Sequence, residues 1–390
     1  MLFQEFTRQI YVICYLWTVV FISCTTDLAA QQRSIKCLGN DSVWNILTPY
    51  FCAPDSLKDR KGNYRSVFDN YDSKQVQLKA NWRERRMKIK KKWHSMMGVW
   101  PPLLEKQLFE IIDTIDKDTY YKHLVKFYLT PQEQTEAYLL VPKGQGKKPA
   151  VITVFYEPET AIGEGKPNRD FALQLTKRGF ITLSVGTKNA SERQEFSLFY
   201  PTIEHAKVQP LSMLAYAAAN AYHVLANHIE VDASKIGIIG HSFGGKWAMF
   251  ASCLFDKFTC AVWSDPGIVF QQDRASVNYW EPWYLGYHPK PWRKRGLITA
   301  RNPAKGLYPQ LISEGYNLHE LHALMAPRPF LVLGGAEDPI ERWVALNHTI
   351  AVNRYLGYEN RVAMINRPNH EPNRESNEIA YLFFEYFLKE

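Results

Sequence analysis

Residues 240–245, Gly-His-Ser-Phe-Gly-Gly, constrain the fold of this chain more than any other segment. The apolar run before them, 235–240, predicts a buried strand, and the run after them, 244–253, predicts a helix. A G-x-S-x-G pattern between a strand and a helix makes a turn too sharp for side chains beside the serine. We therefore expect the Ser242 hydroxyl to stand exposed above a sheet. The backbone N–H of Phe243, at the start of the helix, can stabilise an oxyanion that develops there.

Short apolar strands alternate with helical segments around this turn. Strands are expected at residues 121–129, 134–141, 150–156, 179–185, 235–240, 260–263, 328–333 and 361–365. Helices are expected at about 170–178, 211–227, 244–253, 341–356 and 375–388, and helical spacing also continues from about 76 to 113. The alternation predicts an α/β fold whose mostly parallel sheet is covered by helices on both faces.

The N-terminal residues have the character of a targeting segment. Arg8 precedes an apolar run, 10–24, which is short for a membrane span, and small residues follow up to Ala30. A signal peptide over 1–30 is the favoured interpretation, and a lipoprotein signal with a lipid on Cys24 is the alternative. No later run is long and apolar enough for a transmembrane helix. We expect a secreted or periplasmic protein, with an irregular and helical extension over 31–115 and the catalytic domain over 116–390.

Cysteines and charge bear on the compartment and the partners. Beyond the signal segment, proximity favours the disulfides Cys37–Cys52 and Cys253–Cys260, although free buried thiols fit equally well. The formal net charge is +8, and much of it lies in residues 83–92. We interpret that run as the solvated face of a helix rather than as a nucleic-acid site.

A serine nucleophile needs a base and an orienting acid. His370 lies in the loop after the last expected strand, where a fold of this kind places the base. Asp338, after the strand 328–333, is the first choice for the acid, and Asp265, one strand earlier, is the second. The second oxyanion donor is expected from the loop after the strand 150–156, around Glu157.

Residues 271–322 interrupt the alternation and are rich in Trp, Tyr and Pro. We expect this insertion to lie over the active edge of the sheet. Trp280 and Trp283 could stack on sugar rings or merely hold a long loop in place. Lys246 and Arg274 could bind a carboxylate or hydroxyls, or could be surface charges.

The turn at Ser242, the Asp338-Pro339 pair and Asn369-His370 together resemble the α/β-hydrolase superfamily over residues 120–390. Within it the chain is most similar to glucuronoyl esterases and acetyl xylan esterases among the carbohydrate esterases. The resemblance implies an acid at the place of Asp265, a further one at the place of Asp338 in many bacterial members, and a lysine where Lys246 stands. Glucuronoyl esterases carry an arginine directly after the serine, where this chain has Phe243.

Residues and resemblance together predict a secreted serine esterase that removes acetyl, methyl or uronoyl groups from polysaccharide, with a carbohydrate ester as its partner. No cofactor is expected, and no H-E-x-x-H or C-x-x-C spacing for a metal is present. One alternative is a serine peptidase of the prolyl-oligopeptidase type, but about 120 residues before the sheet cannot form that group's propeller. The other is a non-catalytic glycan-binding homologue, against which the complete Ser–His–Asp set argues.

Overall fold

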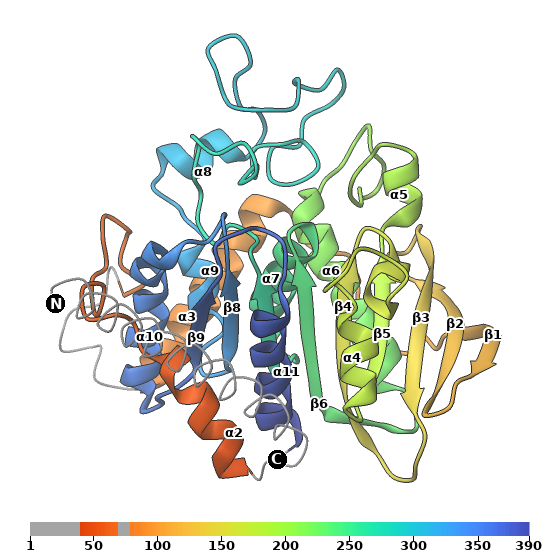
Figure 1. The fold of residues 1–390 in the computed structure, drawn as a ribbon. Helices are drawn as coiled ribbons and strands as arrows, with labels where there is room; N and C mark the ends of the chain where they lie inside the picture. The colour runs from red at the N-terminus through yellow and green to blue at the C-terminus, as the bar shows by residue number, and fades with distance from the viewer. Residues whose placement is uncertain (1–39, 69–78, 390) are drawn as a thin grey trace, which may run out of the picture. The chain divides into compact units, whose positions relative to one another are not determined.

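The computed structural model describes residues 40–68 and 79–389 (Figure 1). Contacts divide the chain into two units, Met1–Ile46 and Leu47–Glu390. The described part of the first unit belongs to helix α2 (Asn40–Leu47), and the second unit holds the sheet. The expected signal segment, Cys24 and Cys37 lie outside the described residues. Within the described residues, no helix is long and apolar enough to cross a membrane.

A single sheet runs through the second unit, and nine strands of the described chain form it in the order β1-β2-β3-β5-β4-β6-β7-β8-β9. Pairing is antiparallel from β1 to β5 and parallel from β5 to β9. The strands from β5 onward are almost wholly buried, as strands covered on both faces should be. Their bounds are β1 (Glu110–Asp116), β2 (Tyr120–Tyr128), β3 (Gln134–Pro142), β4 (Lys148–Phe155), β5 (Ile181–Gly186), β6 (Val231–His241), β7 (Cys260–Ser264), β8 (Phe330–Gly334) and β9 (Val362–Asn366).

Helices cover both faces of the sheet, which confirms the predicted α/β fold (Figure 1). Helices α4 (Phe171–Lys177) and α11 (Arg374–Lys389) pack on one face, and α6 (Pro210–Ala226) and α7 (Phe243–Leu254) pack on the other. The alanines of α6 are buried, so its backbone can approach α7 closely. The remaining helices in the part of the chain that the structure describes are α3 (Lys79–Met97), α5 (Lys188–Glu192), α8 (Tyr308–Ser313), α9 (His319–Ala323), α10 (Trp343–Leu356) and the short 3-10 turns η2 (Thr48–Phe51), η4 (Pro158–Ile162) and η5 (Ile340–Arg342).

One expectation is wrong. The helical spacing expected to reach residue 113 ends at Met97, because Gly98 and the pair Pro101-Pro102 follow, and strand β1 occupies 110–116 instead. Of the alternatives left open for Cys253 and Cys260, the structure has the free, buried thiols and not the favoured disulfide. Cys52 is also free. The basic run on α3 does present charge to solvent, with Trp82, Ile89 and Trp93 buried beneath it.

Residues 265–307, between β7 and α8, contain no helix or regular strand and lie above the carboxyl ends of the strands (Figure 1). A buried ion pair holds this segment together from within: Arg293 Nη1 lies 2.8 Å from Glu281 Oε1, and the two side chains are 1% and 0% exposed. The Trp280 indole N–H donates to the Gly296 carbonyl at 3.0 Å. A loop this long is therefore fixed in place by its own polar side chains.

Candidate active site

Ser242 forms the sharp turn between β6 and α7. Its backbone has φ 57° and ψ −111°, a conformation that few residues other than glycine adopt. A Cβ atom on Gly240 would lie 2.2 Å from the carbonyl oxygen of Gly244, and one on Gly244 would lie 1.9 Å from the carbonyl oxygen of Val154. Both glycines are thus required by the close approach of backbone to backbone that holds the serine above the sheet.

A chain of hydrogen bonds runs from Ser242 into the protein interior. The Ser242 Oγ atom lies 2.9 Å from His370 Nε2, and His370 Nδ1 lies 2.7 Å from Asp265 Oδ2. The Asp265 side chain is fully buried, while that of His370 is 32% exposed. A carboxylate at Nδ1 keeps the proton on that nitrogen and leaves Nε2 free to accept the serine proton. The carboxylate at His370 belongs to Asp265, and not to Asp338, which was the first choice from sequence.

Asp338 is instead bonded to the segment that follows Asp265. Its two carboxylate oxygens accept the backbone N–H groups of Gly267 at 2.8 Å and Ile268 at 2.6 Å. Arg342 Nε lies 3.4 Å from the same carboxylate. Burial raises the pKa of Asp338, and the negative charge of Asp265 raises it further. Asp338 therefore holds the backbone that follows Asp265 and does not contact the imidazole of His370.

Arg367 ties the loop that carries His370 to the sheet. Its guanidinium donates to the carbonyl oxygens of His370 at 2.7 Å, Glu371 at 2.9 Å and Leu333 at 3.0 Å, and to Ser264 Oγ at 3.2 Å. Burial lowers the pKa of Arg367, against the pull of two nearby buried carboxylates. Sequence reasoning missed this residue, because an arginine in a loop gives no sign that its side chain turns inward.

His241, directly before the serine, does not face it. Its Nδ1 atom lies 3.1 Å from Ser264 Oγ, and its ring centroid is 4.6 Å from that of His370. Burial lowers the pKa of His241 well below its usual value, and the positive charge of a protonated His370 would lower it further. A neutral imidazole therefore packs beside that of His370.

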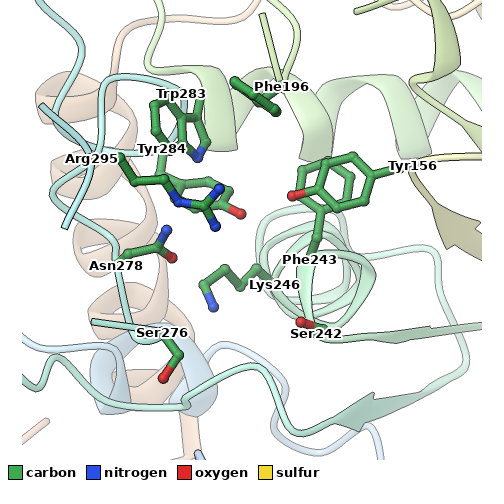
Figure 2. Close-up of a pocket in the computed structure, with 10 residues that line it drawn as sticks. All are labelled: Tyr156, Phe196, Ser242, Phe243, Lys246, Ser276, Asn278, Trp283, Tyr284 and Arg295. Atoms are coloured by element: carbon green, nitrogen blue, oxygen red, sulfur yellow. The ribbon is translucent and has the colours of Figure 1, made fainter. Parts of the chain in front are cut away.

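A cavity of about 140 Å³ opens beside Ser242 (Figure 2). Its wall comes from α7, from the end of β4, from the segment 265–307 and from the segment after α5, which carries Phe196. The aromatic side chains that line it are Tyr156, Phe196, Phe243, Trp283 and Tyr284, and the polar ones are Ser242, Lys246, Ser276, Asn278 and Arg295. Figure 2 shows the Lys246 and Arg295 side chains both extending into the space between the aromatic walls.

The oxyanion candidates lie where the strand ends of β4 and β6 meet. Phe243 is the first residue of α7, and its ring stacks on that of Tyr156 with a centroid distance of 3.8 Å and an interplanar angle of 10°. Glu157 follows Tyr156 and precedes η4, and its side chain is exposed. Tyr156 rather than Glu157 contributes its side chain to the cavity, so only a backbone N–H could be the contribution of Glu157.

Of the four residues that the sequence offers for substrate binding, two line the cavity and two do not. Lys246 and Trp283 line the cavity. Trp280 does not: it is fully buried and its ring packs against Tyr308. Arg274 does not line it either, because its guanidinium donates to the Ala336 carbonyl.

Arg295 is a cavity residue that sequence reasoning missed. It lies in an irregular segment, where no periodicity assigns a side chain to one face or the other.

Among the described residues, no group of three or more His, Cys, Asp or Glu side chains could hold a metal ion.

Solved structures share this arrangement of strands and helices. A glucuronoyl esterase from Solibacter usitatus matches with a TM-score of 0.64 at 16% identity, covering 83% of this chain and 96% of that one. A carbohydrate esterase family 15 glucuronoyl esterase from Caldicellulosiruptor kristjansonii matches with a TM-score of 0.57 at 19% identity, covering 84% and 92%. The fold is that of the α/β-hydrolases. An acetyl xylan esterase from Paenibacillus sp. R4 also matches, with a TM-score of 0.50 at 17% identity, covering 86% of this chain and all of that one.

Sequence comparison reaches a smaller part of the chain. The family described as BAAT / acyl-CoA thioester hydrolase C-terminal matches residues 214–308, which run from within α6 to the start of α8. Among curated proteins, no sequence matches. The expected resemblance to carbohydrate esterases is therefore confirmed at the level of the fold.

Proposed function

We propose that the chain is a serine esterase that hydrolyses ester substituents on polysaccharide. The single observation that carries the proposal is the hydrogen-bonded series from Ser242 Oγ through His370 to the buried carboxylate of Asp265. A serine that merely ended a strand would need neither a base at 2.9 Å nor an acid behind that base.

In the first step, Ser242 Oγ attacks the ester carbonyl while His370 Nε2 takes its proton. Negative charge develops on the carbonyl oxygen, and the backbone N–H of Phe243 at the start of α7 stabilises it, with a second N–H from the loop at Glu157. The imidazolium then protonates the leaving alcohol, and an acyl group remains on Ser242.

In the second step, His370 removes a proton from water, which attacks the acyl carbonyl. The tetrahedral intermediate collapses, the acid leaves, and Ser242 Oγ regains its proton from His370. Asp265 keeps Nδ1 protonated through both steps and stabilises the imidazolium each time it forms.

The substrate class rests on the cavity wall and on the fold relatives. Aromatic side chains at Trp283, Tyr284 and Phe196 suit stacking on sugar rings. The solved structures with the same fold include glucuronoyl esterases and an acetyl xylan esterase. The apolar run at residues 10–24 favours secretion, which would bring the enzyme to such a polymer.

The test uses recombinant chain from residue 31 onward, with p-nitrophenyl acetate and the methyl ester of glucuronic acid as substrates. We expect turnover of at least one of them, and we expect Ser242→Ala to abolish it while circular dichroism stays unchanged. Absence of hydrolysis by a folded protein, or equal rates with Ser242→Ala, would contradict the proposal.

A second candidate is hydrolysis of a thioester. The match of residues 214–308 to an acyl-CoA thioester hydrolase region favours it, and the same serine and histidine would perform it. Release of free thiol from acetyl-CoA, followed with a thiol reagent, separates the two. A higher kcat/KM for the thioester than for the oxygen esters would favour this second candidate.

A further inference from the structure

The cavity beside Ser242 has an unbalanced charge. Two cationic side chains, Lys246 and Arg295, contribute to its wall, and none of its described lining residues is acidic. A cavity whose charged lining side chains are all cationic attracts anions, and its low-dielectric aromatic walls strengthen that attraction.

Lys246 supplies a buried charge at the base of the cavity. Its Nζ atom donates to the Pro266 carbonyl at 2.6 Å and lies 5.0 Å from the centre of the Tyr279 ring. Burial lowers the pKa of Lys246 to about 8, while Asp338 and other buried carboxylates oppose the shift. The ammonium group is therefore still mostly protonated at neutral pH.

Arg295 supplies the second charge, at the outer part of the cavity. No hydrogen bond or ion pair joins its guanidinium to another of the described residues, and its side chain is exposed. Arg293, two positions earlier, has its guanidinium fully engaged by Glu281 and by backbone carbonyls. Of these two arginines, Arg293 therefore serves the internal structure of the segment, and Arg295 faces the cavity without a hydrogen-bond partner among the described residues.

We propose that Arg295 and Lys246 form a subsite for a free carboxylate on the substrate, so that the preferred ester carries an anionic group close to the scissile carbonyl, as a partly esterified acidic polysaccharide does. This inference rests on the proposed esterase function and narrows its substrate class. A guanidinium matches a carboxylate with two parallel hydrogen bonds, whereas a neutral acetyl or methyl ester would leave it unused. Arg295 is then a specificity residue that touches the substrate but not the reacting atoms.

The kinetic test compares esters that differ in charge. One pair is p-nitrophenyl hydrogen succinate and p-nitrophenyl butyrate, which places the carboxylate on the acyl side. The other is 4-acetoxybenzoate and its methyl ester, which places it on the alcohol side. We expect the charged member of at least one pair to have the higher kcat/KM, and that pair identifies the side on which the carboxylate binds.

Variants then assign the preference to a residue. Arg295→Gln should lower the ratio of charged to neutral kcat/KM by about tenfold, as loss of a charge-assisted hydrogen bond at a half-open site implies. Arg295→Lys keeps the positive charge but cannot form the two parallel hydrogen bonds of a guanidinium, so it should lower the ratio less than Arg295→Gln does. Arg301→Gln is the matched control, because Arg301 is exposed on the same segment but does not line the cavity, and the ratio should not change.

A binding measurement keeps this inference separate from catalysis. In the Ser242→Ala background, calorimetry should detect D-glucuronate but not D-glucose, and Arg295→Gln should weaken the glucuronate signal. Esters hydrolysed without any charge preference, or a preference that survives Arg295→Gln, would overturn the carboxylate subsite and leave the esterase proposal standing. Glucuronate binding without ester hydrolysis would support the subsite and contradict the esterase.

Discussion

Asp265 and Asp338 each hold the backbone of the other's loop. The Asp265 Oδ1 atom accepts the N–H of Asp338 at 2.8 Å and that of Gly335 at 2.8 Å. The Asp338 carboxylate accepts the N–H groups of Gly267 and Ile268, which follow Asp265 in the chain. The loops after the neighbouring strands β7 and β8 are therefore joined by hydrogen bonds from the backbone of each loop to the carboxylate of the other. Only the Asp265 carboxylate also reaches the imidazole of His370.

These hydrogen bonds predict that substitution of Asp265 lowers mainly kcat and that substitution of Asp338 lowers mainly the stability. Asp265→Asn should lower kcat by about a thousandfold or more, because an amide does not hold the productive His370 tautomer. Asp338→Asn should lower the free energy of unfolding by about 1–3 kcal/mol, since the amide cannot accept both N–H groups, with a smaller effect on kcat. Steady-state kinetics and urea unfolding of both variants check this, and a larger kcat loss for Asp338→Asn would reverse the assignment.

Arg367 should matter for rate although it does not touch the serine. Arg367→Lys retains the charge but cannot reach four acceptors at once, so the His370 loop should lose its fixed position and kcat should fall by about 10- to 100-fold. Arg354→Lys, at an exposed ion pair with Asp59, is the control and should change kcat little. Equal kcat for Arg367→Lys and the native protein would show that the loop is held by other contacts.

Stability should fall in mild acid because of buried histidines. Burial lowers the pKa of His319 to about 3, and its Nδ1 atom has no partner among the described residues. As the pH falls, the unfolded chain therefore takes up a proton on this imidazole before the folded chain does. The contribution of the neutral His319 to the free energy of unfolding is complete above about pH 6.5 and is lost as the pH falls from there towards 3.

The His319→Gln variant isolates that contribution. Its amide can still donate to the Arg65 carbonyl, which His319 Nε2 approaches to 2.7 Å, but it takes up no proton. The loss of unfolding free energy between pH 7 and pH 5 should then be smaller than in the native protein, by on the order of 1–2 kcal/mol. His205→Gln, at an exposed position, is the control. Parallel stability curves for His319→Gln and the native protein would contradict the prediction.

The turn at Ser242 should not tolerate a methyl group. Gly244→Ala would place Cβ 1.9 Å from the Val154 carbonyl oxygen, so β4 and α7 would have to separate. We expect a loss of about 2 kcal/mol or more in unfolding free energy, together with loss of activity, because the displaced turn moves the serine from His370. Thermal unfolding and p-nitrophenyl acetate hydrolysis measure both, and a variant with native melting temperature and native rate would contradict this account.

Much of this architecture follows from local patterns in the sequence. The strands β4 to β9 contain short apolar runs, and helices α4, α6, α7, α10 and α11 lie close to the bounds that the sequence predicts, so alternation alone predicts the sheet. The short helices α5, α8 and α9 were not predicted. Strand β1 escaped prediction because all seven of its residues are exposed, and Glu110–Asp116 therefore lacks the alternation that a half-buried strand shows. The helical spacing expected to reach residue 113 also included the first residues of this strand.

Which aspartate meets the histidine depends on features that a sequence does not display. Asp265 and Asp338 both follow the carboxyl ends of parallel strands, so either could approach His370. The difference arises from the backbone of Asp265, whose φ of 49° turns the chain, and from the N–H groups that bind Asp338 elsewhere. Arg295 escaped prediction because it lies in an irregular segment, only two residues after Arg293, whose side chain is buried against Glu281.

The segment 265–307 begins with Asp265 and also carries Asn278, Trp283, Tyr284 and Arg295 of the cavity wall. This segment cannot be replaced as a whole without also replacing Asp265, the hydrogen-bond partner of His370. A laboratory graft meant to change the substrate should therefore join the chains after Ile268, whose N–H is held by Asp338. Within the segment, residues 265–268 serve the chemistry, and residues 269–307 carry the cavity wall that a graft would replace.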